Sequence, residues 1–546
     1  MSDLREPWLS MLVLPAAYPS EGSGASVSGN TAAVERVDTH ISNVFLTPGR
    51  VYKLRRPVTL SFVDFSSPRE RLADCLREVA LNRRLAPDVY LGIAPIHFQA
   101  GELKVRIGDA LETPCEQADV VEHCVVMRRL ATGRDLKSLV EAGVVHAAHI
   151  DRIADTLAAF HRAWRIRPPA PEGDERWVAR STAPARANIA ALAEVPSWLA
   201  PRDAVEEARV LGARFLERHR ADFERRFDEG RIVDGHGDLH SEHVWFETDD
   251  GPALMIDCLE FREDFRCIDS ASDIAFLAMD LRYRGRGDLA ARLLRRYARD
   301  GDDWHLFTVV DYFQSYRSLV RAKVAALVAV DESLPSAQRD HAKSSVGAHL
   351  QLGLEFLRDK PAGNVIVTCG TIGTGKTTVA EALADRTGAV VISSDWLRRH
   401  AAAASASHVA ARYDDASRNA IYERMLEAAG WVIDSGRTVI LDATFSRRQW
   451  RQAVATWARE RGVAPALVEV VAPGDEVRER LASRERAGND ASEAGPGLID
   501  TIRAEFEAPD EWPGDRIARI DSGGDRWERQ VDEALARLGL GRRAGG

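Results

Sequence analysis

The chain has 546 residues, of which 45% are apolar and 29% are charged, and its formal net charge is −10. This length accommodates two large domains or three to four smaller ones, and the composition is that of a globular protein. The negative charge disfavours a protein that coats nucleic acid, although a local basic groove stays open as an alternative.

The first residues and the cysteines indicate a reduced, cytoplasmic protein. The apolar run 8–14 follows charged residues and ends at Pro15, so it makes a poor signal peptide and is too short to cross a bilayer. Residues 20–33 are rich in glycine and serine, and we assign 1–33 to a flexible N-terminal segment. The six cysteines contain no C-x-x-C pair, which predicts neither a disulfide framework nor a zinc site. We expect no membrane partner, and the oligomeric state is not predicted.

Residues 34 to about 130 are predicted to form antiparallel strands with one helix. The strand-like runs, separated by turns, are 34–38, 41–46, 51–54, 59–64, 92–98, 102–107 and 122–127. The helix is predicted over 68–85, where apolar residues recur at helical spacing. Lys53 lies on one of the strands and Glu78 on the helix. In kinases such a lysine–glutamate pair orients the α- and β-phosphates of ATP.

Residues 131 to about 360 are mostly helical in pattern, with short strands around the loop His236-Gly-Asp-Leu-His240. Asp238 on this loop, His243 five positions later and Asp257 beyond the next strand have the spacing of a phosphoryl-transfer site. In such a site the first carboxylate accepts the proton of the incoming hydroxyl, and the later groups hold Mg²⁺. A zinc site or a structural histidine turn is the alternative for these three histidines.

These residues resemble the aminoglycoside phosphotransferase family, a small-molecule branch of the protein-kinase-like fold, over about 34–360. The resemblance implies an α+β domain with an N-lobe at about 34–130, a helical C-lobe at about 131–360, and ATP with Mg²⁺ as cofactors. It makes Asp238 the catalytic base, Asp257 a metal ligand, and Lys53 with Glu78 the phosphate-binding pair. By the same resemblance, Met127-Arg-Arg-Leu130 is the hinge beside the adenine.

The chain departs from this family in two respects. His243 stands where the family has an asparagine, and because Mg²⁺ prefers oxygen ligands this metal position is weaker or occupied by water. Glu260 is an alternative ligand. No G-x-G-x-x-G covers the phosphates, and a domain that has lost catalysis stays open. The basic segment that contains Arg317, Arg321 and Lys323 is interpreted as a solvated helix face, with an anionic acceptor pocket as the alternative.

A compact linker, 360–363, marks the predicted start of a second domain, 361–546. From there strands alternate with helices, which predicts an α/β domain with a parallel sheet. The stretch 370–377 fits the phosphate-loop pattern G-x-x-x-x-G-K-[ST] between a strand and a helix. The candidate nucleotide-binding residues are Gly370, Thr371, Ile372, Gly373, Thr374, Gly375, Lys376, Thr377 and Thr378. Lys376 would reach the β- and γ-phosphates, and the Thr377 hydroxyl would ligate Mg²⁺.

The remaining strands of this domain deliver further polar residues to the same edge of a sheet of about five strands. The strands are predicted at 364–369, 388–395, 438–444, 466–471 and 516–520. Asp395 would accept the proton of the acceptor, Arg398 would hold an anionic group, and Asp442 would hold Mg²⁺ through water. Arg480 and Arg484 share a helical face and are candidates for a lid that closes over the phosphates. A solvated helix is the alternative.

This half is similar to the P-loop kinases grouped with gluconate kinases, polynucleotide kinases and zeta toxins, with an AAA-type ATP-binding fold. The resemblance implies that Asp395 is the acceptor-side base and Arg484 a lid residue. The joined pattern resembles bacterial two-domain proteins and predicts a bifunctional ATP-dependent kinase. The predicted acceptors are hydroxyls of small molecules such as sugars, sugar acids or aminoglycoside-like compounds. A polynucleotide 5′-hydroxyl kinase with an accessory N-terminal domain and a nucleotide-dependent regulatory switch are the alternatives.

Overall fold

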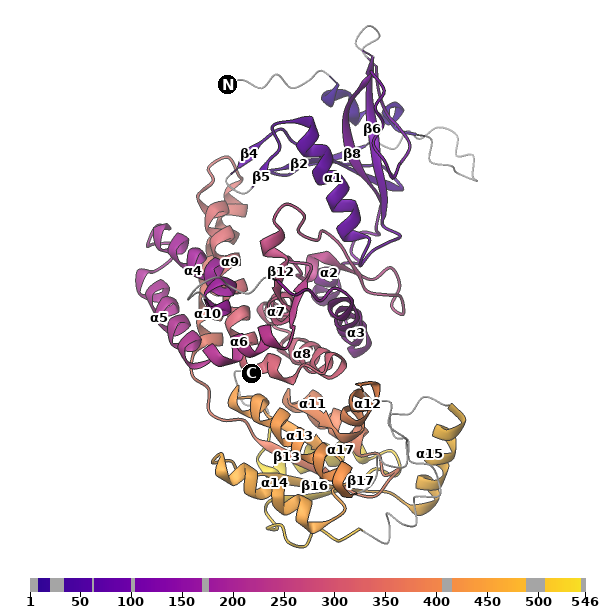
Figure 1. Cartoon of the computed structure of the whole chain (residues 1–546), viewed down its shortest axis with the longest axis vertical. Coiled ribbons are helices and arrows are strands. Elements are labelled where there is room, and N and C mark those ends of the chain that lie inside the picture. Colours follow the sequence, from indigo (N-terminus) through magenta and orange to yellow (C-terminus); the bar gives the residue numbers. More distant parts are fainter. Residues whose placement is uncertain are drawn as a thin grey trace. The chain divides into compact units, whose positions relative to one another are not determined.

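The computed structural model describes residues 8–19, 34–60, 63–99, 104–168, 176–404, 415–487 and 506–541 (Figure 1). The chain folds into two compact units, and neither is continuous in sequence. The first consists of Met1–Arg152, Phe160–Pro168 and Ile232–Asp273, and the second of Ile153–Ala159, Pro169–Arg231 and Ile274–Gly546. None of the helices within the described residues has the length and apolar character needed to cross a membrane.

The first unit is built on an antiparallel sheet with the strand order β1-β2-β3-β8-β6-β7. Its strands are β1 (Glu35–Asp38), β2 (Ser42–Leu46), β3 (Arg50–Arg55), β6 (Tyr90–Gln99), β7 (Lys104–Ile107) and β8 (Val120–Arg128). Smaller antiparallel pairs are β4 (Thr59–Leu60) with β5 (Val63–Asp64), β9 (Ile232–Asp234) with β12 (Cys267–Asp269), and β10 (Val244–Trp245) with β11 (Leu254–Met255). The antiparallel N-lobe expected from the sequence is therefore present.

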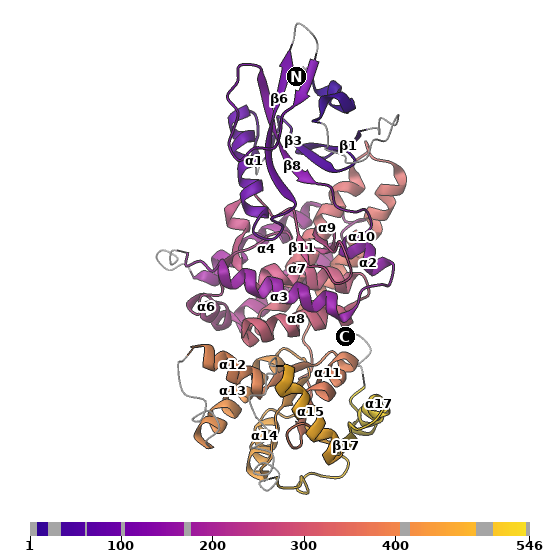
Figure 2. The ribbon, with the colours of Figure 1, turned by 90° about the vertical axis from the view of Figure 1, so that its right-hand side faces the viewer.

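Helix α1 (Pro68–Asn82) lies along this sheet and carries part of the site (Figure 2). It begins where the Ser67 hydroxyl accepts a hydrogen bond from the N–H of Glu70, with a proline in the first turn. Its inner face buries Cys75 and Val79 against β6 and β8. The other helices of this unit are η1 (Leu9–Val13), η2 (Pro15–Ala17), α2 (Leu136–Glu141), η3 (Ser241–His243) and η4 (Glu263–Phe265), and α3 (Ala147–Ala163) continues into the second unit.

Residues 8–19 differ from the flexible segment expected over 1–33. They form the short helices η1 and η2, and Trp8, Leu12 and Ala17 are buried in the same core as the strands of the sheet. The apolar run that makes a poor signal peptide is thus a packing element, because its apolar side chains cover the sheet. The glycine- and serine-rich residues 20–33 lie outside the described residues.

The second unit contains a parallel sheet with the order β14-β15-β13-β16-β17, which confirms the predicted five-stranded P-loop fold. Its strands are β13 (Val365–Cys369), β14 (Val390–Ser393), β15 (Val439–Asp442), β16 (Ala466–Val471) and β17 (Ile517–Asp521). Its helices around the sheet are α11 (Lys376–Thr387), α12 (Ser394–Ala404), α13 (Asp415–Asp434), α14 (Arg448–Glu460), α15 (Gly474–Ala487) and α17 (Trp527–Leu538). Because β13 lies between β15 and β16, the loop that follows it opens at the centre of the carboxyl edge, where such sheets bind ligands.

The same unit includes the helices that precede the sheet. They are α4 (Trp177–Glu194), α5 (Arg202–Arg218), α6 (Arg220–Asp228), α7 (Ser270–Tyr283, which begins in the first unit), α8 (Gly287–Gly301), η5 (Trp304–Thr308), α9 (Val310–Val330) and α10 (Ser336–Leu357). Asp311 on α9 pairs with Arg437 just before β15, and Arg295 on α8 pairs with Asp385 on α11. The boundary expected at 361 therefore falls inside a compact unit.

Candidate active sites

Lys53 on β3 lies between two carboxylates in the first unit. Its Nζ atom is 2.8 Å from Glu78 Oε1 on α1 and 2.8 Å from Asp257 Oδ1, which follows β11. Burial acts to lower the pKa of Lys53, but the two carboxylates, Asp257 first, raise it well above its ordinary value. The Lys53 charge in turn holds the pKa of Asp257 well below its usual range. The structure thus brings together three residues predicted for phosphate and metal binding.

Asp257 has an unusual backbone conformation that the surroundings maintain. Its φ is 61°, in the left-handed region that residues other than glycine seldom adopt. Its N–H donates to the Tyr90 hydroxyl over 3.1 Å, and the N–H of Cys258 donates to Asn82 Oδ1 over 2.8 Å. Strained residues persist where the structure around them fixes them, commonly at functional sites. Here the strain directs the carboxylate toward Lys53.

Asp273, which sequence reasoning missed, fixes the loop that carries Asp238. Its carboxylate accepts hydrogen bonds from the N–H groups of His236 (2.7 Å) and Gly237 (2.9 Å) and from His161 Nε2 (3.0 Å). Burial acts to raise the pKa of Asp273, yet these hydrogen bonds and the histidines hold it well below its usual range. Gly235 is needed here, because a Cβ atom would lie 2.5 Å from Asp273 Oδ2. The signal in the sequence was limited to an aspartate at the start of a helix.

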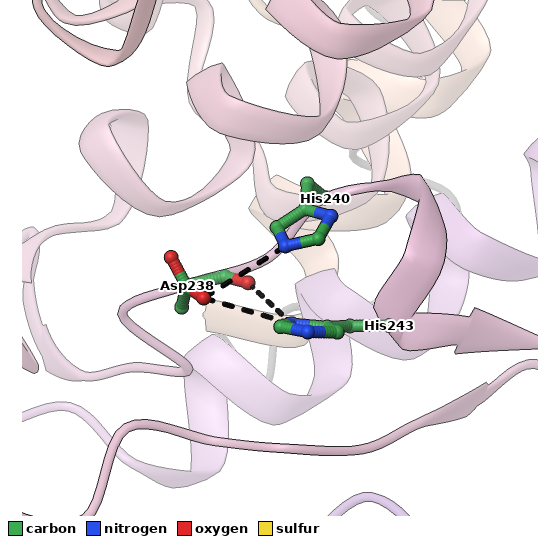
Figure 3. Close-up of side chains that lie close together, drawn as sticks. All are labelled: Asp238, His240 and His243. Carbon is green, nitrogen blue, oxygen red and sulfur yellow. Dashed lines mark hydrogen bonds and ion pairs between the residues drawn. The ribbon is translucent and has the colours of Figure 1, made fainter. Parts of the chain in front are cut away.

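Asp238 lies beside two histidines on the same loop (Figure 3). Its Oδ2 atom is 3.8 Å from His240 Nε2 and 3.8 Å from His243 Nδ1, and the two rings lie 3.9 Å apart between centroids. These three side chains form a group that has the donor atoms of a metal site. The Asp238 side chain is 40% exposed, so an acceptor hydroxyl can reach it. Geometry therefore supports both the catalytic-base hypothesis and the zinc alternative.

The metal position predicted at Asp257 and His243 fits Mg²⁺ poorly. His243 Nε2 is 3.6 Å from Asp257 Oδ2, so the two side chains converge. Mg²⁺ requires near-octahedral oxygen ligands and dehydrates reluctantly, and an imidazole nitrogen does not meet that requirement. Glu260, the alternative oxygen ligand, is buried and bonded to Arg55 instead. A magnesium site of the ordinary kinase type is therefore not assembled here.

Arg55 organises a second set of buried charges that the sequence did not reveal. Its guanidinium contacts Asp74 Oδ2 at 2.7 Å and Glu78 Oε2 at 2.6 Å on α1, and also Glu260 Oε1. Burial raises the pKa of Glu260, although the guanidinium of Arg55 opposes this effect. Glu78 therefore bridges Lys53 and Arg55, so the position of the phosphate lysine depends on both.

In the second unit the phosphate loop joins β13 to α11 as the sequence predicted. Gly370 has φ 147°, and a Cβ atom there would lie 2.2 Å from the carbonyl oxygen of Val470, so only glycine fits. Lys376 begins α11, and its Nζ donates to the carbonyl oxygen of Thr371 over 2.8 Å. The lysine thus lies over the loop in which phosphate oxygens bind, beside the positive N-terminus of a helix.

Asp442 at the end of β15 meets the first turn of this helix. Its Oδ2 atom accepts a hydrogen bond from the Thr377 hydroxyl over 2.8 Å, and its Oδ1 atom accepts one from Thr368 over 3.1 Å. A hydroxyl and a carboxylate in contact are the oxygen donors that hold hydrated Mg²⁺ in P-loop enzymes. Unlike the first site, this position fits Mg²⁺.

The segment after Asp442 is held in a strained conformation. Phe445 has φ 41°, and its ring stacks on Tyr422 with centroids 4.9 Å apart. Its carbonyl oxygen accepts a hydrogen bond from Arg451, which is fully buried and paired with Glu511. These contacts fix the segment that follows Asp442, and nothing local in the sequence indicated them.

The acceptor-side residues lie on α12, directly after β14. Asp395 Oδ1 accepts a hydrogen bond from Arg398 Nη1 over 2.8 Å, so the two predicted acceptor residues form an ion pair. The pair lies one turn of helix apart, which is the spacing that the sequence offered.

Two arginines on α15, Arg480 and Arg484, are predicted to form a lid, and the structure describes the side chain of Arg480 only. Arg480 donates to the Ser522 hydroxyl (2.9 Å) and carbonyl (2.7 Å), and that hydroxyl donates to the carbonyl oxygen of Thr374. Arg480 therefore ties the loop after β17 to the phosphate loop. Arg484 lies on the same helix, but its side chain is outside the described residues.

Comparison with known proteins gives two matches along the chain. A model of a phosphotransferase enzyme family matches residues 42–307, and a model of an AAA domain matches residues 365–509. The fold and the two sites define an ATP-dependent kinase in which a phosphotransferase domain precedes a P-loop kinase domain. The chain is 32% identical over 504 residues to an uncharacterized protein of Mycobacterium tuberculosis and to one of Mycobacterium bovis, covering 91% of this chain and 94% of theirs. It belongs to the same family as these mycobacterial proteins.

Among the solved structures that match the chain are two kinases, each covering about a third of it. The APS kinase of Mycobacterium tuberculosis, in complex with AMPPNP and APS, is 21% identical, with a TM-score of 0.26, over 33% of this chain and 99% of that chain. A gluconokinase from Sinorhizobium meliloti is also 21% identical, with a TM-score of 0.25, over 33% of this chain and 95% of that chain. Neither likeness identifies the acceptor of this chain.

Proposed function

We propose that the protein carries two phosphoryl-transfer sites, each of which moves the γ-phosphate of ATP to a hydroxyl of a small molecule. The observation that supports this most directly at the first site is the contact of Lys53 with the Asp257 carboxylate. At the second site it is the phosphate loop, in which Lys376 Nζ donates to the carbonyl oxygen of Thr371 and the neighbouring Thr377 donates to the Asp442 carboxylate. The acceptors are sugars, sugar acids or aminoglycoside-like compounds.

At the first site Lys53, oriented by Glu78, holds the phosphates, and Asp238 accepts the proton of the acceptor hydroxyl. The hydrogen bonds from the loop to Asp273 keep Asp238 in place during the transfer. Because phosphoryl transfer needs mainly positioning and charge stabilisation, these fixed groups account for most of what the protein must supply.

At the second site the backbone N–H groups of 370–377 and Lys376 bind the phosphates. Asp395 accepts the proton of the acceptor, and Arg398 contacts an anionic substituent on it. Thr377 and Asp442 would hold Mg²⁺, which would offset the negative charge of the phosphates.

The experiment measures ADP release by the full chain with a panel of sugars, sugar acids, aminoglycosides and a 5′-hydroxyl oligonucleotide. Lys376→Ala and Asp238→Asn should each remove the response to a different acceptor, by about 100-fold or more. Lys343→Ala, which changes an exposed lysine paired with Asp340, is the matched control and should respond like the wild type. Turnover in the double variant equal to that of the wild type would contradict both assignments.

The same panel separates the alternatives. A response to the oligonucleotide alone would favour a polynucleotide kinase, and ATP turnover that no acceptor stimulates would favour a regulatory switch. Two independent responses, each lost in one single variant, are the outcome that the two-site proposal requires.

A further inference from the structure

The metal position of the first site has an imidazole where a magnesium site needs oxygen. We propose that His243 Nε2 and the Asp257 carboxylate bind a first-row transition metal ion in preference to Mg²⁺, with Mn²⁺ as the spectroscopic probe of the position. The inference rests on the proposed function of this site as a nucleotide-dependent phosphotransferase. It assigns different metals to the two sites of one chain.

The hydrogen bond of His243 determines which ring nitrogen is available. Its Nδ1 atom lies 2.9 Å from the main-chain oxygen of Asp238. A carbonyl oxygen only accepts hydrogen bonds, so Nδ1 carries the proton and Nε2 of the neutral ring carries the lone pair. Histidine ligands of metals are commonly oriented in this way, with the second nitrogen donating to a carbonyl or carboxylate. His243 is thus prepared to ligate through Nε2.

That nitrogen faces the carboxylate of Asp257. The two donor atoms, His243 Nε2 and Asp257 Oδ2, are 3.6 Å apart. Donors that share one ion at about 2.1 Å each lie about 3.0–3.4 Å apart, so a small shift brings both into contact with the same ion. The φ of 61° at Asp257, maintained by Tyr90, holds the carboxylate in this direction.

The buried charges beside the position also favour a cation. Lys53, Arg55 and the more exposed Arg77 are the cations in contact with four carboxylates, those of Asp74, Glu78, Asp257 and Glu260. The carboxylates therefore exceed the cations, and a divalent ion at Asp257 would offset the excess. Imidazole suits the divalent ions of iron, nickel, copper and zinc, whereas carboxylate, carbonyl and water suit Mg²⁺ and also Mn²⁺, the weakest binder of the first transition row.

The alternative donor set consists of Asp238, His240 and His243. It would use His243 Nδ1, which is already hydrogen-bonded to the main-chain oxygen of Asp238. In that group the Asp238 carboxylate faces His243 Nδ1, at 3.8 Å. Because this atom donates its proton to a main-chain oxygen, the ring would have to change tautomer and lose that hydrogen bond before it could bind an ion there. The pair of His243 Nε2 with Asp257 needs no such change.

The test is pulsed EPR of the full chain with Mn²⁺ and a non-hydrolysable ATP analogue. We expect modulation from a directly bound imidazole nitrogen in the wild type, which His243→Asn removes while lowering Mn²⁺ affinity relative to Mg²⁺ by about 10-fold or more. His240→Asn is the matched control, one turn away on the same loop, and should retain the nitrogen signal. A wild type without the nitrogen signal, or its loss in His240→Asn, would overturn the assignment.

These outcomes do not depend on turnover. Nitrogen coupling in a protein that no acceptor stimulates would support the metal assignment while contradicting the proposed function. Acceptor-stimulated turnover with Mn²⁺ coordinated only by oxygen would support the proposed function and contradict the metal assignment. Thermal unfolding of each variant, recorded beside the spectra, separates loss of a ligand from loss of the fold, and the wild-type spectrum alone decides the case if a variant does not fold.

Discussion

Arg55 is the side chain on which the charges of the first site converge. It is fully buried, and its guanidinium joins helix α1, through Asp74 and Glu78, to the segment after β11, through Glu260. A buried arginine with several carboxylates is tolerated because each charge has a counter-charge, and removal of one partner leaves the others uncompensated. The orientation of Glu78, and with it that of Lys53, therefore depends on Arg55.

Arg55→Met retains much of the side-chain volume but removes the guanidinium from three buried carboxylates. We expect the free energy of unfolding of the first unit to fall by about 3–5 kcal/mol, and kcat at the first site to fall while the second site is unaffected. Urea unfolding and acceptor-stimulated ADP release measure the two effects. Arg77→Met removes an exposed partner of Asp74 and should change neither quantity. Equal losses of unfolding free energy and of kcat in the Arg55 and Arg77 variants would contradict the central role of Arg55.

At the scale of elements, helices α9 and α10 pack along much of their length and bury Leu319, Val346 and Leu350 between them. His349 on α10 lies beside this core. Its ring stacks on Tyr283 with centroids 3.8 Å apart. A titratable ring in such a position couples the stability of the helices to pH.

Burial, together with the charge of Arg321, lowers the pKa of His349 to about 4, with Asp280 opposing and Arg284 acting in the same direction. In the unfolded chain a histidine titrates near about 6.5, so between these values the unfolded state binds a proton that the folded state does not. The stabilising contribution is therefore complete above pH 6.5 and is lost as the pH falls toward 4, by up to about 3 kcal/mol.

His349→Gln should remove this part of the pH dependence of unfolding. The measurement is the difference in unfolding free energy between the wild type and the variant from pH 7 to pH 4.5, which should shrink as the pH falls. His341→Gln, an exposed histidine on the same helix, is the control and should leave the slope unchanged. A constant difference between wild type and His349→Gln across this range would contradict the assignment.

At the scale of the whole molecule, the sequence was informative where the chemistry is local or follows a family pattern. The phosphate loop is contiguous, so its spacing predicted the strand, the loop and the helix around Lys376. The residues that support these groups were not predictable in the same way. Arg55 meets Glu260, which lies far along the chain, and Asp273 acts through main-chain N–H groups of another loop. Arg480 shared a helix face with Arg484, but periodicity did not indicate that it would contact Ser522.

The predicted boundary at 361 does not separate the two compact units, because the last helices before it belong to the same unit as the P-loop sheet. Asp311 on α9 is buried and pairs with Lys360 Nζ at 2.7 Å and Arg437 Nη2 at 2.5 Å. A chain cut after residue 360 would separate Asp311 from Arg437, and Lys360 alone would stay with it. The activity of each site is therefore better isolated by substitutions in the full chain than by expressing the halves.

Asp311→Asn tests this connection in the intact protein. The substitution removes the carboxylate from two partly buried cations, and we expect the unfolding free energy of the second unit to fall by about 3–5 kcal/mol. Calorimetry of the full chain should show the transition of this unit at a lower temperature, while the transition of the first unit stays in place. Asp359→Asn, which removes an exposed partner of Arg218, should leave both transitions unchanged because exposed ion pairs contribute little. If the Asp311 variant unfolded like the wild type, the ion pairs of Asp311 would not connect the helices to the P-loop sheet, and the separated halves would become suitable for assays.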